Sequence, residues 1–317
     1  MKKALLVLLL LTPFYLIAQD YVDILKVGYS QNFDSKYESY SETTDIKSID
    51  VDFTYPVVIN KYNALITGFM YSRNNLELFP QLNQTQGPTS PFRYSDNISL
   101  HTTILKLGLA TTFSDKWSGT FALLPKLASD YIDISNDDFY LGGVAILKYQ
   151  KHERLKYRAG IFAIDQAYGW FTTPILGFYY ISKNSKFEMD VSAPVSADIN
   201  YTISPSVTLG FDYLGIGRSF DVHQENTPDY YVDYGALEFT CYVQYAFLEN
   251  NVLLRAKAGY ADFDAEAYAD GDDVGFRVSA FNIGAGDRTQ LNPELSSGFF
   301  GKIEAVYRFS FSANKDD

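Results

Sequence analysis

The sequence has a single cysteine, no cluster of basic residues and, beyond residue 19, no apolar run long enough for a transmembrane helix. Cys241 has no partner for an intrachain disulfide, and we expect it to act as a small apolar side chain on a strand. The 26 basic residues face 38 acidic ones, which gives a net charge of -12 at pH 7. This balance disfavours binding to nucleic acid, which needs a clustered basic surface. The low mean hydropathy disfavours a polytopic helical membrane protein.

Residues 1–18 have the composition of a secretory leader. Lys2 and Lys3 precede an apolar run that is interrupted by Pro13. Because a helix needs about 20 apolar residues to cross a bilayer, we expect a cleaved signal peptide rather than an anchor. Cleavage is expected after Ala18, within a residue or two, and the loss of two lysines would change the net charge from -12 to -14.

The most frequent pattern in the rest of the chain is an alternation of apolar and polar residues with a period of two. It is clearest from Phe187 to Ile203, where every odd position is apolar or small, and it recurs over 49–57, 237–247 and 299–311. Side chains on a strand point to opposite faces in turn, so each segment has one apolar and one polar face. Over the first half of the chain, short polar connections alternate with long ones, which is typical of a barrel with tight turns at one rim.

Three architectures fit many alternating strands: a soluble sandwich, a soluble ligand-binding barrel and a membrane-spanning barrel. Soluble strands average about five or six residues, whereas these segments reach the length that crosses a bilayer at a tilt. Aromatic residues concentrate near the segment ends, as an interfacial girdle requires. The expected girdle residues are Tyr21, Tyr55, Tyr71, Trp117, Phe139, Tyr157, Trp170 and Tyr231. The sequence therefore predicts an all-β protein, a transmembrane antiparallel up-and-down β-barrel over residues 19–311, with a polar tail at 312–317.

The number of spanning strands is expected to be 12 to 14. The twelve clearest segments are 21–33, 46–59, 64–76, 97–112, 117–128, 139–149, 155–165, 173–182, 207–220, 230–247, 252–262 and 298–311. The stretch 186–203 leaves two alternatives. Pro194 cannot donate a ladder hydrogen bond and favours a hairpin, which leaves Ala261–Ser297 as an external loop. If 186–203 is instead one long strand, residues 274–286 must span as well, and both alternatives give fourteen strands.

The last predicted strand alternates strictly and ends in aromatic residues. One of its faces carries Phe299, Ile303, Tyr307, Phe309 and Phe311. This run resembles the carboxy-terminal strand of bacterial outer-membrane barrels, which the barrel-assembly machinery recognises. The tail from Ser312 departs from that pattern, in which an aromatic residue normally ends the chain. The resemblance implies that the barrel-assembly machinery is a partner.

Three other segments carry a wider resemblance. They are LPKLASDYIDISNDDF at 124–139, TPILGFYYIS at 173–182 and APVSADINY at 193–201. With them, the chain resembles uncharacterised outer-membrane β-barrel proteins of Gram-negative bacteria that have a signal peptide, no plug domain and a similar length. The resemblance implies a place in the cell outer membrane and contact with its lipid, and it implies no established activity and no cofactor.

The polar face of the predicted strands carries charges of both signs. The residues expected to line the lumen are Asp50, Asp52, Lys156, Arg158, Glu188, Asp190, Glu238, Arg255, Lys257, Glu304 and Arg308, and Lys148, Asp212 and Lys302 share their phase. Unpaired charges in a dry interior are costly, so these groups must pair across strands or face water. Two interpretations stay open: a weakly selective, water-filled pore that passes small polar solutes passively, and a structural or surface-interaction barrel whose lumen is closed by salt bridges.

No catalytic or metal site is expected. The acidic loops contain clustered carboxylates, but their spacing matches no calcium-binding loop, so solvated loops are the favoured interpretation. His101, His152 and His223 lack a serine at the spacing of outer-membrane hydrolases, which leaves a lipid hydrolase as the least favoured function.

Overall fold

The computed structural model describes residues 21–33, 35–37, 43–80, 97–224, 227–284 and 288–310. Every regular element in this part of the chain is a β-strand, and no helix within it is long and apolar enough to cross a membrane. The predicted leader at 1–18, Phe311 and the tail at 312–317 lie outside the described residues.

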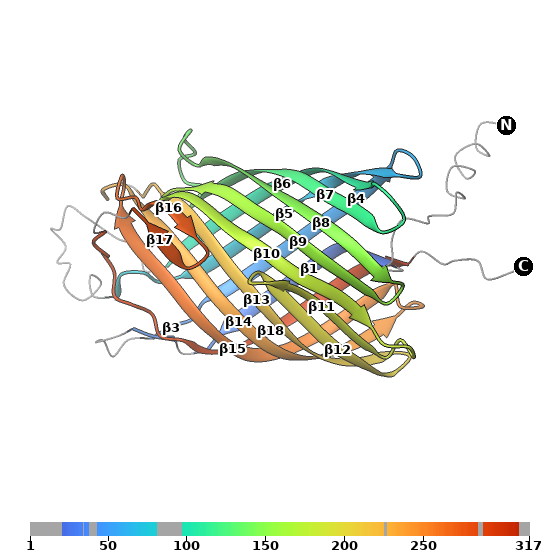
Figure 1. Cartoon of the computed structure of the whole chain (residues 1–317). Helices are drawn as coiled ribbons and strands as arrows, with labels where there is room; N and C mark the ends of the chain where they lie inside the picture. Colours follow the sequence, from blue (N-terminus) through green and yellow to red (C-terminus); the bar gives the residue numbers. More distant parts are fainter. Residues whose placement is uncertain are drawn as a thin grey trace, which may run out of the picture.

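Fourteen strands close into an antiparallel barrel (Figure 1), and the pairing of β1 with β18 completes the ring. In order around the wall they are β1 (Tyr21–Asn32), β4 (Lys47–Val58), β5 (Asn63–Leu76), β6 (Ile98–Thr112), β7 (Trp117–Ser129), β8 (Phe139–His152), β9 (Leu155–Gln166), β10 (Gly169–Ile181), β11 (Phe187–Ala193), β12 (Ser196–Ser204), β13 (Val207–Val222), β14 (Tyr230–Phe247), β15 (Val252–Ala269) and β18 (Gly298–Ser310). The predicted all-β, antiparallel barrel is confirmed, and its strand number is even, as in bacterial single-chain barrels.

The uncertain stretch 186–203 forms the hairpin β11–β12, which turns at Pro194 and Val195. The alternative of one long strand is wrong. Residues 274–284, the described part of the alternative segment 274–286, accordingly do not span the wall. They contain the short strands β16 (Gly275–Val278) and β17 (Phe281–Ile283), and β16 pairs in parallel with the start of β10. The expected external loop after residue 261 begins later, because β15 continues to Ala269 in register with β14.

The two rims of the barrel differ. Tight turns and the ends of β1 and β18 share one rim, here called the terminal rim, and the long connections share the other, the loop rim (Figure 1). A second pair of short strands, β2 (Ser35–Lys36) and β3 (Thr43–Thr44), lies in the first long connection.

The wall has one discontinuity, which we call the seam. β11 reaches only Leu176 of β10, and β12 reaches only Leu214 of β13. Toward the loop rim, Gly169–Ile175 of β10 and Gly215–Val222 of β13 therefore have no barrel strand between them. Because unpaired strand edges are costly, other groups must satisfy this part of the two strands.

The outward face of the wall is apolar and exposed. Leu123 is 58% exposed, Leu141 54% and Leu176 65%. Contiguous apolar surface of this kind is rare on soluble monomers and is the lipid-facing band of a membrane barrel.

The predicted aromatic girdle is found in part. Tyr55, Trp117, Phe139, Tyr157 and Trp170 are exposed on the outer face. The prediction was wrong for two residues, because the Tyr21 hydroxyl points inward to Glu188 and Tyr231 is buried beneath the loop that follows β15.

Close approach of neighbouring strands makes Gly177 a sensitive position. A Cβ there would lie 1.8 Å from the backbone oxygen of Val191, whereas a Cβ at Gly217 would meet nothing within 4 Å. We expect Gly177→Ala to lower the free energy of unfolding by about 1–3 kcal/mol, the usual cost of overpacking. Urea titration followed by heat-modifiable gel migration measures it, with Gly217→Ala as the matched control. Equal stability of the two variants would contradict the packing described here.

Candidate functional site: the interior of the barrel

Contacts between strands that are not neighbours identify the inward face of the wall. Lys106 on β6 reaches over β5 to Asp52 on β4, with an Nζ–Oδ1 distance of 2.5 Å. Arg158 on β9 reaches over β10 to Asp190 on β11, at 2.8 Å. Such contacts form on the concave side of a closed sheet, so these side chains point into the barrel.

Charges nearer the terminal rim form a continuous network on the inward face. Glu304 accepts contacts from Arg255 at 3.1 Å and from Lys257 at 3.6 Å, and Lys257 also contacts Asp212 of β13 at 2.6 Å. The network continues through Arg308, whose Nε lies 2.6 Å from Asp23. Every charge in this group has an opposite charge beside it, which offsets the cost of removing it from bulk water.

The other sequence-predicted lumen residues share this face. Lys302 on β18 contacts Asp50 on β4 over β1, at 3.2 Å. Glu188 accepts a hydrogen bond of 2.8 Å from the Tyr21 hydroxyl, which links β11 with β1 on the opposite side of the ring. Lys156 and Glu238 occupy the inward phase of β9 and β14, next to Tyr157 and Phe239, which face outward.

Solvent reaches this network. The side chain of Asp52 is 40% exposed and that of Asp50 is 33% exposed, although both lie inside the ring. The terminal-rim half of the interior therefore combines accessible carboxylates with paired cations.

The inner face is not polar all the way round. Over the middle of β5–β10 the inward residues are apolar, and we call this stretch the apolar side. It comprises Met70, Ile104, Val144, Ile146, Phe162, Ile164 and Ile175. Charges of both signs thus lie on the inward face of β11–β18, β1 and β4, whereas the inward face in the middle of β5–β10 is apolar.

The loop-rim half of the interior is filled by apolar side chains, which we call the apolar plug. It includes Leu76, Leu100, Phe220, Val222, Val232, Phe263 and Phe300, all buried in one cluster. The plug crosses the barrel, because the rings of Phe79 and Tyr230 meet edge to face at 5.6 Å between residues that follow β5 and begin β14. Among the described residues, the interior at this level is therefore filled mainly by apolar packing.

On the terminal-rim side of the plug, one polar contact also crosses the barrel. Arg218 on β13 donates to Ser72 on β5 at 2.5 Å. In the described residues, the Nδ2 of Asn74 and the hydroxyl of Thr102 are buried at this level without a hydrogen-bond partner. A polar layer thus separates the plug from the charged half.

The loop-rim end of β13 lies inside the barrel. Ser219 and Asp221 have the outward phase of β13, yet they contact inward residues of β8 and β9, on the other side of the seam. The amide and hydroxyl of Ser219 donate to Gln166 of β9, and the hydroxyl of Tyr140 on β8 donates to Asp221. At the seam, the outer face of β13 therefore packs under the inner face of β8 and β9, so that the two edges overlap.

On the loop-rim side of this overlap, a histidine connects the loop after β13 with the loop between β7 and β8. His223 Nε2 lies 3.2 Å from Asp138, and its backbone amide donates to Asp130. Burial lowers the pKa of His223, but its hydrogen bond to Asp138 and the charges of Asp138, Asp130 and Asp221 outweigh burial and hold that pKa above its usual value. Burial also raises the pKa of Asp130, against the hydrogen bonds it accepts from two backbone amides.

The other histidines lie apart. His101 faces outward, accepts or donates a 2.9 Å hydrogen bond with Tyr71 and stacks on Tyr131. His152 lies at the β8–β9 turn. No group of histidine, cysteine and carboxylate side chains in the described ranges is arranged to hold a metal ion.

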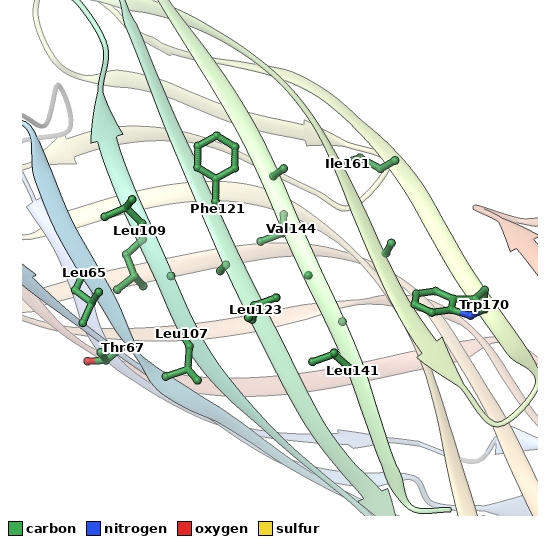
Figure 2. A pocket seen from close by; sticks show the side chains of 17 residues that line it. Leu65, Thr67, Leu107, Leu109, Phe121, Leu123, Leu141, Val144, Ile161 and Trp170 are labelled. Carbon is green, nitrogen blue, oxygen red and sulfur yellow. The ribbon is translucent and has the colours of Figure 1, made fainter.

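The outer wall carries two features of interest. Phe299, Ile303, Tyr307 and Phe309 of the last strand point outward and are exposed. Figure 2 shows an apolar groove on the outside of β5–β10, where Leu107, Phe121, Leu123, Leu141 and Ile161 surround positions occupied by glycine and alanine. This groove belongs to the lipid-facing surface.

Sequence reasoning missed the plug and the overlap. The available signal was a loss of alternation: residues 230–236 are YYVDYGA, and all but Gly235 are buried whichever way they point. Arg277 and Arg288 were also missed. Both contact Asp233 on the outside of β14, at 2.7 and 3.2 Å, from a stretch that lacks any strand-like period.

A family model described as "Domain of unknown function (DUF6268)" matches residues 89–270, more than half of the chain. No curated protein matches the chain.

Several solved barrels resemble the fold weakly. An outer membrane channel from Pseudomonas putida F1 aligns at 8% identity and a TM-score of 0.41, covering 90% of this chain and 93% of that one. The NanC porin aligns at 11% identity and 0.37, covering 89% and 98%. The Pseudomonas putida toluene transporter TodX aligns at 10% identity and 0.36, covering 89% and 88%. Scores of this size do not indicate a shared function.

The raised pKa of His223 predicts a pH-dependent loop contact. A group whose pKa rises on folding stabilises the fold fully below its unfolded pKa, and this contribution is lost as pH rises through the folded value. Asp130, also raised, acts in the same direction at lower pH. We expect amide protection of residues 130–138 to fall as pH rises from about 6 to 9, since the unfolded pKa of histidine is about 6.5.

Hydrogen-exchange mass spectrometry, corrected for the intrinsic pH dependence of exchange, measures this loss of protection. In His223→Gln the fall should disappear, while His152→Gln should leave it unchanged. A fall of the same size in His223→Gln would show that another group controls the contact.

Proposed function

The chain belongs to the DUF6268 family, and we propose that it is an outer-membrane β-barrel channel for small polar solutes that is gated at the loop rim by the apolar plug. The proposal includes a Gram-negative outer membrane as its location, delivery by the leader predicted at residues 1–18, and recognition of the last strand by the barrel-assembly machinery.

The observation that carries the proposal is the charged network inside an apolar outer wall. Outward leucine, isoleucine and aromatic side chains suit lipid, whereas inward charges of both signs are partly exposed to solvent, Asp52 among them. A hydrated inner surface of paired charges supports passage of small polar molecules with weak selectivity. Nothing in this network is arranged for covalent chemistry, and the proposal includes no enzymatic step.

The plug makes the proposed channel a gated one rather than a permanently open pore. Its members belong to strands that are held by their own ladders, and they meet through side chains such as Phe220 and Leu100. Side-chain packing is non-directional and can rearrange without breaking the backbone ladder of the wall. A hydrophobic constriction of this kind also blocks ions by excluding water.

Loosening the plug should open the axial path. Phe220 is fully buried and packs edge to face on Tyr234. We expect Phe220→Ser to raise the single-channel conductance of the refolded protein in a planar bilayer severalfold over that of the unaltered chain, because a hydroxymethyl group replaces an aromatic ring in the constriction. Phe139→Ser, the same change on the outer face near the same rim, serves as the control.

Heat-modifiable migration must show that both variants form barrels. If folded Phe220→Ser and a second plug variant, Leu100→Ser, are as silent as the control, the gated-channel proposal is wrong.

Ion selectivity should depend on the inward charges. Arg158 pairs with Asp190 and donates to Ser192, while Arg73 is exposed on the outer face. In the Phe220→Ser background, Arg158→Glu should shift the reversal potential in a salt gradient toward cation preference, and Arg73→Glu should not. An identical reversal potential in both would place the ion path away from β9.

A barrel with a closed lumen is the second candidate, and the continuous burial of the plug favours it. Its role would be structural, or it would bind outside partners through the long loops. Silent plug variants that fold normally would support this function over passage of solutes.

A further inference from the structure

The seam between β10 and β13 is the one place in the described wall where the barrel is not closed by a ladder of its own strands. Toward the terminal rim, the seam ends at the β11–β12 turn, where the Gly215 amide donates to Val195. Toward the loop rim, it ends at the contact of Gln166 and Ala167 with Ser219. Between these limits no barrel strand pairs with the edges of β10 and β13, and Gly169–Thr172 of β10 pair with β16 instead.

Two residues in the middle of the seam are of types that are tolerated at an unpaired strand edge. Pro174 of β10 has no N–H to satisfy, and it is exposed. On the opposite side, Gly217 of β13 is exposed, and a Cβ there would meet nothing within 4 Å. Both residues have the outward phase of their strands, so neither fills the seam with a large side chain.

The hairpin β16–β17 covers, from outside, the part of the seam nearer the loop rim (Figure 1). Four residues of β16 pair with Gly169–Thr172 of β10. The pairing ends where the hydroxyls of Thr173 and Ser279 meet at 2.8 Å. β16 belongs to the long connection after β15, so its pairing with β10 is not one of the ladders between successive barrel strands.

Side chains anchor this cover to the strands beside it. Arg277 of β16 makes two hydrogen bonds to Asp233 of β14, at 3.2 and 2.7 Å, and lies over the ring of Tyr168 at 4.0 Å. The cover is thus held by the Arg277–Asp233 pair, by four backbone pairings to β10, and by packing of the adjoining Val274 in one buried cluster with Tyr168, Tyr231 and Tyr268.

Apolar surface lies on both sides of the seam. Outside, Leu176 and Phe281 are 65% and 74% exposed. Inside, Ile175 of β10 and Leu214 and Ile216 of β13 point to the apolar side of the interior. A path through the seam would therefore connect the lipid-facing surface with an apolar inner wall and would meet no charged residue of the terminal-rim network.

We propose that the seam is a lateral doorway through which small apolar molecules move between the bilayer and the apolar side of the interior, with the β16–β17 hairpin as its cover. The proposal rests on the membrane placement in the proposed function. It does not depend on passage of polar solutes, because that path runs along the axis and through the plug.

A reversible lock on the cover tests the doorway. Thr173→Cys and Ser279→Cys place two thiols where hydroxyls now lie 2.8 Å apart, close to the sulfur–sulfur distance of about 2.05 Å in a disulfide. Cys241→Ser removes the native exposed thiol. The probe is N-phenylnaphthylamine, an apolar dye that fluoresces in apolar surroundings and enters intact Gram-negative cells slowly.

We expect cells that express the reduced double-cysteine variant to take up the dye several times faster than cells without the protein. Oxidation should reduce that rate to the level of cells without the protein, and a thiol reductant should restore it. Each single-cysteine variant, treated alike, should show no effect of oxidation. Arg277→Ala, which removes the anchor on Asp233, should accelerate uptake beyond the unaltered chain.

Equal uptake by oxidised and reduced protein, with the disulfide verified by mass, would overturn the proposal. So would uptake at background level by both the unaltered chain and Arg277→Ala when both form heat-modifiable barrels. Planar-bilayer conductance of the plug variants reports the axial path separately, so failure of the doorway and failure of the polar channel are distinguishable.

Discussion

A peptide backbone in contact with lipid has no water to satisfy its N–H and C=O groups, and this constraint determines how the chain is closed. Most of the wall meets it with antiparallel ladders that run the length of both partners, such as β13–β14 and β14–β15. The hairpin β11–β12 is too short to pair with the whole of β10 and β13, and other groups provide the missing hydrogen bonds. On β10 these come from β16. On β13 they come from the side chain of Gln166 and, nearer the loop rim, from the amide of Asp130, which donates to the carbonyl of Asp221.

The plug follows from this local solution. To reach Gln166 and Tyr140, the loop-rim end of β13 must move beneath the inner face of β8 and β9, which brings its own inward residues into the centre of the barrel. Phe220 and Val222 then meet Leu76 and Leu100 from the far wall in a single apolar cluster. A short hairpin on one side of the wall thus accounts for the buried apolar cluster at the loop rim, while the charged half near the terminal rim keeps its access to solvent.

The sequence was sufficient for the regular part of this architecture. Alternation with a period of two identified the strands and their inward phase, and Pro194 favoured the hairpin that gives fourteen strands. It could not place β16, because a four-residue strand pairing in parallel from within a long loop has no periodic signal. It also could not reveal the overlap, since Ser219 and Asp221 keep the outward phase of their strand and change only what they touch. The partners of the lumen charges depended on register, which alternation leaves undetermined.

Axial and lateral movement pose different physical problems in this barrel. A polar solute on the axis meets accessible charges first and then the plug, where it would have to shed water among phenylalanine and leucine side chains. An apolar molecule at the seam enters nearer the terminal rim than the plug, since Pro174 pairs with Ile161 of β9, whereas the plug residue Tyr140 precedes Gly142, which pairs with Ile164 closer to the loop rim. It would exchange lipid for Ile175 and Ile216, which is a transfer between two apolar surroundings with little free-energy cost. The plug therefore opposes movement of polar solutes along the axis. Movement of apolar molecules through the seam would instead be controlled by the β16–β17 hairpin and its anchor, Arg277.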